Sequence, residues 1–548
     1  MSALHRPNAF RKRTFSRYKK SSLILLFLAV FLNASANFAQ TDTGRLRKQA
    51  EKAMRRGEFA EAEKAWREML QHEPDNYKYR LGLSHSLLKQ RLLVQSYSEA
   101  KTVAERHPKN ARAYALLGST LLGAGNFTAA RELLNIALNL NSEEPLALAG
   151  FAMLDFHENR SEWGFARLNY AIYLDPQEPD FVYYLAQVAA RTEKYKEAAA
   201  AYEKFLEIAP NTDVDRRERI QGLIHFLRYL GAQKKLYTIQ GKPQTTVKIE
   251  IVNNRPILNV TINDSDEPLR FVLDSGSAAT VISDATAKRL GVKEVARGGK
   301  ARAVGGEGKF NIVYGFLNSL NIGAVQINKI PVYIRKFFHH NEPVDGYIGI
   351  SVISRFLTTI DYGNQSFSLV KQEKKNKEAA LPQVEKTTQN PNDLSIPLHI
   401  TTSGFLSGEV KIDSVPRKLN FIVDTGASIS VVSAETAKFY ELSRFAQPTM
   451  YRVFGAAGVT ENVTSLNLPR VDFGLNSQEK IQAAVLDLQP INETAGFEQS
   501  GILGGNFLKN YRVTFDFVNA KILLEPSLPQ KIKTAADVIV GANIEFNP

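Results

Sequence analysis

Apolar and polar positions follow two different patterns along the chain. Residues 43–212 scan as pairs of amphipathic helices, and residues 214–236 continue as one more such helix. After Gly241 the pattern changes to short runs rich in Val and Ile that are separated by Gly, Asn and Asp. Runs of this kind are typical of strands. The sequence therefore predicts a helical part followed by a strand-rich part.

The helical part repeats itself with a period of 34 residues. Small residues at fixed places let two helices approach closely, and a proline after the second helix stops it. The period and the positions of these residues resemble the tetratricopeptide repeat. The resemblance implies five repeats over 43–212 and a protein partner bound in their groove. It also implies a helix over 213–236 that covers the last repeat. Three sets of residues recur at the same position in successive repeats: Pro74, Pro108, Pro176 and Pro210; Ala50, Ser84, Gly118, Ala152 and Ala186; and Ala62, Ser96, Ala130, Gly164 and Ala198.

The strand-rich part is a duplication. Residues 271–283 read FVLDSGSAATVIS, and FIVDTGASISVVS follows 150 positions later. Further on, GYIGISVISRFLTTIDY aligns with GILGGNFLKNYRVTFDF at an offset of 155, so five extra residues are expected in hairpins of the second copy. Two all-β half-domains are predicted, joined by a polar linker and followed by a tail. Their ranges are 245–370, 371–393 for the linker, 394–528, and 529–548 for the tail.

Each copy places one aspartate between two apolar runs. A carboxylate there is costly to bury without a partner, so the repeat suggests that Asp274 and Asp424 are partners. Asp-Ser/Thr-Gly triplets inside duplicated blocks, each with a later apolar-apolar-Gly element, resemble the retropepsin-like aspartic proteases over about residues 245–528. The triplets continue with Ser275 and Gly276 and with Thr425 and Gly426, and the later elements end at Gly349 and Gly504.

The resemblance implies a mechanism and a role for each of these residues. Asp274 and Asp424 would be the catalytic carboxylates, sharing one proton and activating a water without metal or cofactor. The hydroxyls of Ser275 and Thr425 would cross to the opposite half and lock the turns. The glycines of the triplets would leave room for backbone N–H groups, and Gly349 and Gly504 would pack beneath the turns.

Glycine-rich stretches in each half are candidates for flaps that close over a substrate. They are residues 303–310 and 453–460. A plain surface hairpin is the other interpretation. The first half departs from the family pattern, with DSGS in place of DTGA and Ile350-Ser351 in place of Gly505-Asn506. The glycines at the candidate flap tips are Gly305, Gly306, Gly455 and Gly458.

The formal charge of +13 is concentrated at the amino-terminus, where the first 36 residues hold seven Lys or Arg and no Asp or Glu. These residues, the apolar run 23–32 and the sequence Ala-Ser-Ala at 34–36 predict a secretory signal over 1–36. An uncleaved membrane anchor is the alternative. The remaining charge is too mild to indicate nucleic-acid binding. The absence of cysteine suits a bacterial envelope protein, either periplasmic or secreted.

Two functions from different classes follow from these patterns. The first is a secreted aspartic endopeptidase whose repeats bind a partner or present a peptide or protein substrate. The second is a non-catalytic scaffold with an inactive protease fold. The two halves can pair within one chain or between chains. His339 and His340 have no third ligand at metal spacing, so no metal site is expected.

Overall fold

The computed structural model describes residues 43–263, 265–338, 343–372 and 394–527. The predicted signal or anchor, most of the linker, His339, His340 and the carboxy-terminal tail lie outside these residues. The described residues divide into two compact units, one of residues 43–117 with 210–212 and one of residues 118–209 with those from 213 onward. Within the described residues, no helix has the length and apolar character needed to span a bilayer.

Five helix pairs follow one another along the chain, and the small residues predicted between them are buried. The hydroxyl of Ser84 donates to the carbonyl of Ser96 at 2.8 Å, and that of Ser96 donates to the carbonyl of Ser84 at 2.9 Å. Gly164 lies so close to Ala152 that a Cβ on it would be 2.8 Å from the Ala152 carbonyl oxygen. The helices are residues 43–56, α2 (Phe59–His72), α3 (Tyr77–Lys89), α4 (Leu93–Arg106), α5 (Ala111–Gly123), α6 (Phe127–Leu140), α7 (Pro145–His157), α8 (Ser161–Leu174), α9 (Pro179–Arg191), α10 (Tyr195–Ile208) and α11 (Val214–Gly231).

Most strands of the first strand-rich half form one sheet in the order β1-β9-β6-β10-β5-β4-β8-β7, with β3 beside β4 and β9 also paired to β8. Strands β8 and β9 are buried or half-buried over most of their length, with exposed positions at Asn311 and Asn318 of β8 and at Lys329 of β9. Its elements are β1 (Thr238–Gly241), β2 (Gln244–Lys248), β3 (Glu250–Val252), β4 (Arg255–Ile262), β5 (Leu269–Leu273), β6 (Thr280–Ser283), α12 (Asp284–Arg289), β7 (Lys293–Arg302), β8 (Lys309–Ile322), β9 (Val325–Arg335), β10 (Gly346–Ile348), α13 (Ile350–Ile353), β11 (Phe356–Asp361) and β12 (Ser366–Lys371).

The second half repeats this topology in the order β14-β15-β16-β21-β17-β20-β19-β18. The predicted fold class, an all-α solenoid followed by two all-β half-domains, is confirmed. The elements are β13 (Ile396–Pro397), β14 (His399–Ile400), β15 (Leu406–Ile412), β16 (Leu419–Val423), β17 (Ser430–Ser433), α14 (Ala434–Phe439), η1 (Leu442–Phe445), β18 (Ala446–Gly455), β19 (Gly458–Phe473), β20 (Asn476–Leu486), α15 (Gln489–Ala495), β21 (Gly501–Leu503), α16 (Gly505–Leu508), β22 (Tyr511–Asp516) and β23 (Lys521–Pro526).

The expectation that the extra residues of the second copy lie in hairpins is wrong. They belong mainly to η1 and α15, two short helices with no counterpart in the described part of the first half. The hairpin tip between β7 and β8 is in fact longer than the tip between β18 and β19.

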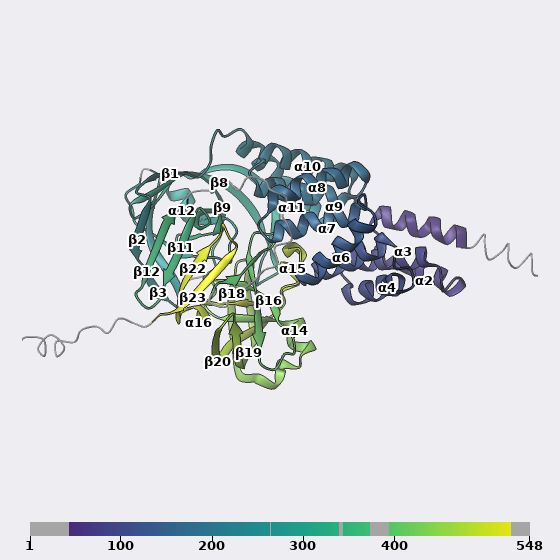
Figure 1. The fold of residues 1–548 in the computed structure, drawn as a ribbon. Helices are drawn as coiled ribbons and strands as arrows, with labels where there is room; N and C mark the ends of the chain where they lie inside the picture. The colour runs from purple at the N-terminus through teal and green to yellow at the C-terminus, as the bar shows by residue number, and fades with distance from the viewer. Residues whose placement is uncertain (1–42, 264, 339–342, 373–393, 528–548) are drawn as a thin grey trace, which may run out of the picture. The chain divides into compact units, whose positions relative to one another are not determined.

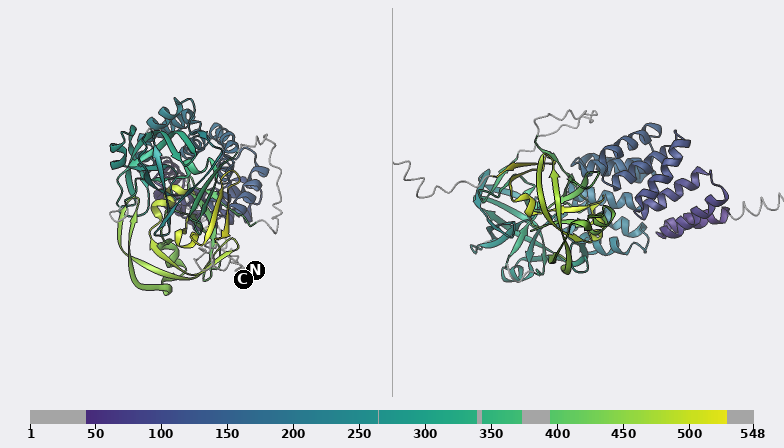
Figure 2. Two further views of the ribbon diagram at one scale, coloured as in Figure 1. Left: turned by 90° about the vertical axis from the view of Figure 1, so that its left-hand side faces the viewer. Right: turned by 90° about the horizontal axis from the view of Figure 1, so that it is seen from below.

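A third sheet joins the two halves within this chain. Its order is β13-β23-β22-β11-β12-β2, and β11 of the first half pairs antiparallel with β22 of the second. Figure 1 shows the yellow strands β22 and β23 beside the teal strands β11 and β12, and Figure 2 shows the strand-rich part from two further sides. Of the two arrangements left open by the sequence, the structure has the intramolecular one.

Helix α11 packs on two neighbours at once. Ile220, Ile224 and Leu227 join the core of the α9–α10 pair. Phe226 and Leu230 form a second apolar cluster with residues of β8, among them Tyr314. The helix therefore covers the last repeat, as the sequence predicts, and also holds the first strand-rich half against it (Figure 1).

Helix α7 is buried on nearly all sides, which a repeat helix with one open face would not be. The ring of His157 lies among aromatic rings that include Phe127 and Phe497, and its Nδ1 is 2.6 Å from the carbonyl oxygen of Ile400 in β14. His399 stacks on Phe127 at a ring distance of 3.7 Å. The second half therefore packs against the carboxy-terminal end of α7.

Candidate active site

Each aspartate of the repeated triplets lies where one strand ends and the chain turns. Strand β10 runs parallel to β5 and antiparallel to β6, and the N–H of Asp274 donates to the carbonyl of Ile348 at 3.0 Å. Strand β21 has the same place between β16 and β17, and the N–H of Asp424 donates to Leu503 at 3.0 Å. The backbone of both turns is therefore fixed in the same way.

The two turns are locked together by reciprocal hydrogen bonds between buried hydroxyls. Thr425 Oγ1 accepts the N–H of Ser275 at 3.1 Å and donates to the carbonyl of Leu273 at 2.7 Å. Ser275 Oγ accepts the N–H of Thr425 at 3.0 Å and donates to the carbonyl of Val423 at 2.8 Å. Because both hydroxyls are fully buried, water cannot replace these bonds.

The carboxyl groups of Asp274 and Asp424 meet across this junction. A Cβ on Gly426 would lie 2.6 Å from Cγ of Asp274, and one on Gly276 would collide with the carboxyl group of Asp424. Each triplet glycine therefore makes room for the carboxyl group of the opposite half. The sequence predicted this need for glycine but assigned the space to backbone N–H groups alone.

The two carboxyl groups share a site but differ in their hydrogen bonds. Oδ1 of Asp274 accepts the N–H of Gly276 at 2.9 Å, whereas Oδ1 of Asp424 accepts those of Gly426 at 2.8 Å and Ala427 at 3.1 Å. Burial and the charge of Asp424 raise the pKa of Asp274 well above its usual value. Burial also raises the pKa of Asp424, and its N–H donors oppose that rise. The pair therefore retains one proton at a pH where isolated carboxyl groups are ionised, and the asymmetry favours Asp274 as its carrier.

Gly349 and Gly504 pack beneath the turns. A Cβ on Gly504 would lie 2.6 Å from the carbonyl oxygen of Ile429, and one on Gly349 would be equally close to that of Ser277. The departure of the first half from the family pattern has a small structural cost. Ser351 Oγ accepts one bond, from the N–H of Thr280, whereas Asn506 Oδ1 accepts two from Ser430.

The candidate flaps are hairpin tips, and the two tips touch. The N–H of Ala457 donates to the carbonyl of Val304 at 3.1 Å. Val304 packs against the apolar cluster of the second half, which includes Ile422 and Leu486. Gly305 and Gly458 have φ of +93° and +141°, which side chains other than hydrogen disfavour. In this structure the two tips are therefore in direct contact with each other.

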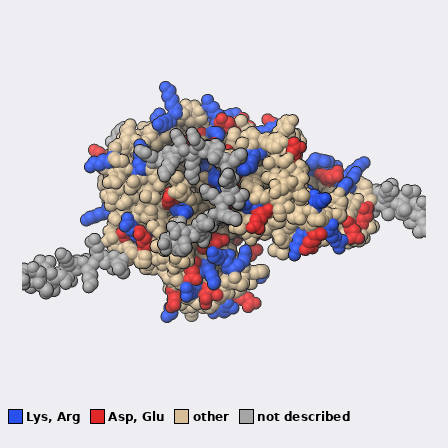
Figure 3. Space-filling model, in the orientation of Figure 1, with Lys and Arg blue, Asp and Glu red and all other residues tan. Residues whose placement is uncertain are grey.

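The two flaps are held very differently. Strand β7 of the first flap lies against α11, where Lys300 pairs with Glu218 at 2.9 Å and Arg302 pairs with Asp215. In the second flap, Met450 is 56% exposed and Phe454 39% exposed. Figure 3 shows basic and acidic side chains interspersed on the lobe that carries β19 and β20. The anchoring of the first flap was not predicted, because it depends on a contact between distant segments.

No group of three or more His, Cys, Asp or Glu residues in the described part of the chain is placed to hold a metal ion. One basic residue near the cleft, Arg335, also escaped prediction. It ends strand β9, next to the strand that follows the Asp274 turn. A comparison of the two copies in register could have found it, because the second half has Leu486 at the same place.

Comparisons with known proteins agree with both parts of the chain. An aspartyl protease family model matches residues 258–352, and the gag-polyprotein aspartyl protease model matches residues 409–510. Tetratricopeptide repeat models match residues 53–118, 95–145 and 179–212. No curated protein matches this sequence.

Solved structures similar to the chain include a tetratricopeptide repeat protein and an aspartic proteinase. A thermophilic tetratricopeptide repeat protein from Thermus thermophilus is 22% identical, with a TM-score of 0.28, over 32% of this chain and 95% of that one. The aspartic proteinase from Irpex lacteus is 12% identical, with a TM-score of 0.34, over 53% of this chain and 99% of that one. Tetratricopeptide repeats are thus followed in this chain by two aspartyl protease domains.

Proposed function

We propose that this chain is an aspartic endopeptidase whose single active site is formed by Asp274 and Asp424. The observation that carries the proposal is the meeting of the two carboxyl groups across the reciprocal Ser275–Thr425 bonds. A scaffold would not need two carboxyl groups in mutual contact, because their repulsion destabilises the fold at neutral pH.

The proposed reaction is direct attack by water on a peptide carbonyl. Asp424, ionised, takes one proton from a water held between the carboxyl groups, and the water oxygen bonds to the carbonyl carbon. Asp274, protonated, donates a hydrogen bond to the carbonyl oxygen and later a proton to the nitrogen as the C–N bond breaks. The proton count of the pair is restored at the end of the cycle, so no covalent intermediate is required.

The repeats and the amino-terminus suggest where and on what the enzyme acts. Tetratricopeptide repeats are protein-binding modules, so we infer that surfaces of the repeats left uncovered by the protease domains bind a protein partner or a substrate segment. The basic and apolar start of the sequence supports export to the periplasm or the exterior, with cleavage near Asn37.

Peptide hydrolysis by the purified chain tests the proposal. Asp274→Asn and Asp424→Asn should each lower kcat/KM by about 10³-fold or more, and the double variant should be little worse, because the pair acts as a unit. A pepstatin-like inhibitor, whose hydroxyl takes the place of the water, should inhibit the parent chain. Hydrolysis that survives in either single variant would contradict the shared site.

The same assay separates the enzyme from the scaffold. Absence of hydrolysis in the parent chain over a broad peptide library and a range of pH, with the fold intact by circular dichroism, would favour the non-catalytic alternative.

A further inference from the structure

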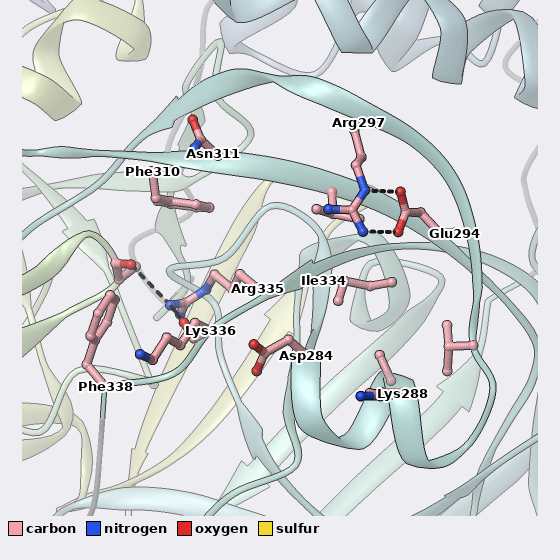
Figure 4. A pocket seen from close by; sticks show the side chains of 14 residues that line it. Asp284, Lys288, Glu294, Arg297, Phe310, Asn311, Ile334, Arg335, Lys336 and Phe338 are labelled. Carbon is pink, nitrogen blue, oxygen red and sulfur yellow. Dashed lines mark hydrogen bonds and ion pairs between the residues drawn. The ribbon is translucent and has the colours of Figure 1, made fainter.

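A pocket of about 620 Å³ opens in the first strand-rich half, between helix α12 and strands β7, β8 and β9. Its lining reaches both flaps, through Phe310 at the base of the first tip and Ala456 at the tip of the second. Figure 4 shows Arg335 in this pocket, with Phe310 on one side and Asp284 on the other. The volume is sufficient for a side chain of a bound peptide.

Arg335 has an unusual set of partners for a cation in a cleft. Its Nη1 donates to the main-chain carbonyls of Ala456, at 3.1 Å, and Lys336, at 3.4 Å. The guanidinium also lies over the rings of Phe310, Phe337 and Tyr347, at 4.9 to 5.7 Å from their centroids. No carboxylate among the described residues forms an ion pair with it.

Arg335 lies close to the candidate dyad. Tyr347, whose ring it covers, is in β10, the strand inserted beside the Asp274 turn. Burial lowers the pKa of Arg335, and Tyr347 and Asp274 oppose this change. When Asp274 carries the shared proton, the negative charge of the pair lies on Asp424, and neither aspartate forms an ion pair with Arg335. A half-buried guanidinium with no ion-pair partner among the described residues favours a ligand that supplies one.

The other charged groups of the pocket reinforce this preference. Glu294 is already paired with Arg297, whose Nη2 is 2.6 Å from Oε2. That leaves the exposed side chains of Lys288 and Lys336 and the carboxylate of Asp284 around Arg335. The unpaired charged groups of the pocket are therefore three cations and one carboxylate, so the pocket is positively charged.

The second half has no such cation at the equivalent position. Strands β6 and β9 pair with Ser283 opposite Arg335, and β17 and β20 pair with Ser433 opposite Leu486. Leu486 is buried in the apolar cluster of the second half. The basic pocket therefore distinguishes one side of an otherwise duplicated cleft.

We propose that the Arg335 pocket binds the carboxylate side chain of an Asp or Glu residue in the peptide substrate. The proposal rests on the proposed peptidase function and adds a substrate class to it. A carboxylate can accept two parallel N–H bonds from the guanidinium, which a neutral amide of the same shape cannot match. Such a ligand would approach as the second tip lifts and Ala456 releases Nη1.

Binding to the full chain carrying Asp424→Asn, which cannot turn over, tests the proposal without reliance on catalysis. The probes are two pools of acetylated and amidated peptides with random apolar and small flanks and a central Glu or Gln. The Glu pool should bind at least about tenfold more tightly, as expected for one charge-assisted hydrogen bond. Adding Arg335→Leu, which copies the second half, should abolish the difference.

Two further variants make the result specific. Arg335→Lys should retain part of the preference, because the charge remains but the fork of donors is lost. Arg470→Met should retain all of it, because this surface cation pairs with Asp472 and lies outside the pocket. Equal binding of the two pools, or a preference that survives Arg335→Leu in a folded variant, would overturn the proposal.

Two more arms identify the source of the carboxylate and separate this proposal from the peptidase function. Tight binding of a Gln pool with a free carboxy-terminus, but not of the amidated Glu pool, would assign the pocket to a chain end and overturn the side-chain assignment. If the parent chain hydrolyses both pools and the Asp424→Asn chain binds them with equal affinity, the pocket proposal is refuted and the peptidase proposal stands. If binding of the Glu pool depends on Arg335 but the parent chain hydrolyses neither pool, the pocket proposal stands and the peptidase proposal is refuted.

Discussion

At the scale of single residues, the burial of the aspartate pair carries a cost in stability above acid pH. The native pKa of Asp274 is raised, so the native state holds its proton more tightly than the unfolded chain does. Stability from this source is complete at acid pH and is lost as the pH rises through the native pKa.

Asp274→Asn should therefore stabilise the protein at alkaline pH. The amide keeps the size of the carboxyl group and removes its repulsion with Asp424. We expect a higher melting temperature than the parent at pH 8, and a difference that shrinks as the pH falls below 3.8, where both carboxyl groups of the parent become protonated. Thermal unfolding followed by circular dichroism at both values measures this. An equal difference at both pH values would contradict the raised pKa.

The sequence could indicate the turn residues because their chemistry is local. Asp424, Thr425 and Gly426 are required by a strand end and a tight turn, and the duplicate at Asp274 shows that the pattern is not accidental. Arg335 could not be found in this way. Arg335 lies near the Asp274 turn only because strand β9 pairs with strand β6. The residues next to Arg335 in the sequence do not indicate that pairing.

At the scale of elements, the first flap is part of a helix–strand interface and the second is not. Gly222 of α11 approaches the backbone of β7 so closely that a Cβ would meet the carbonyl oxygens of Gly298 and Arg297. The glycine-rich tips could be read from the sequence. Their different anchoring could not, since α11 and β7 are far apart along the chain.

Gly222→Ala should push α11 away from β7. The clash is with backbone atoms, which cannot turn aside, so we expect a loss of about 1–3 kcal/mol in the free energy of unfolding. Gly231→Ala in the same helix is the control, because its closest neighbour is the flexible side chain of Lys196. Amide hydrogen exchange over residues 293–302 should be faster in Gly222→Ala than in the parent, and unchanged in Gly231→Ala. In the parent itself, exchange should be faster over residues 446–460 than over residues 293–302. Unchanged exchange in Gly222→Ala would contradict the anchoring.

The contact of α7 with the second half should weaken in acid. Burial lowers the pKa of His157 from 6.5 to about 4 and acts in the same direction on the pKa of His399. A lowered native pKa gives stability that is complete above pH 6.5 and is lost as the pH falls toward 4. Glu158 and Glu409 oppose the shift at His399, and Arg131 adds to it.

His157→Gln should reduce this acid sensitivity. The amide can still donate to the carbonyl of Ile400 but does not titrate, so the variant should be less stable at pH 7 yet lose stability less steeply between pH 6.5 and 4. The expected reduction is about 1.4 kcal/mol per pH unit, the value for one proton. Urea unfolding at four pH values measures the slope. A slope equal to that of the parent would contradict a buried neutral histidine.

At the scale of the whole molecule, the repeats and the protease domains share apolar surface. The sequence predicts that residues 43–236 fold alone, because repeats bury one another's faces. The structure adds that α7 and α11 each bury residues against the strand-rich part. The fold class was therefore predictable from period and patterning, whereas the docking of the two parts depends on side chains whose partners lie far along the chain.

Separate fragments should consequently recognise one another. Fragments 43–236 and 238–548 would each expose apolar side chains, in the second case those of Ile312, Tyr314 and Phe316. We expect both to bind a hydrophobic dye and to form a 1:1 complex when mixed, as measured by size-exclusion chromatography with light scattering. Phe226→Asp in the repeat fragment should weaken the complex. Fragments that stay apart at micromolar concentration would show that the interface is too weak to act in trans.

The difference between Arg335 and Leu486 has a consequence for how a peptide would be read. A perfectly symmetric cleft accepts a peptide equally well in either direction, since turning the strand end for end presents it with the same walls. With a cationic wall on one side and an apolar wall on the other, the two directions are no longer equivalent. In the proposed enzyme, a chain that carries both halves would thus have a fixed direction of binding, with an acidic residue of the substrate always on the same side of the bond that is cut.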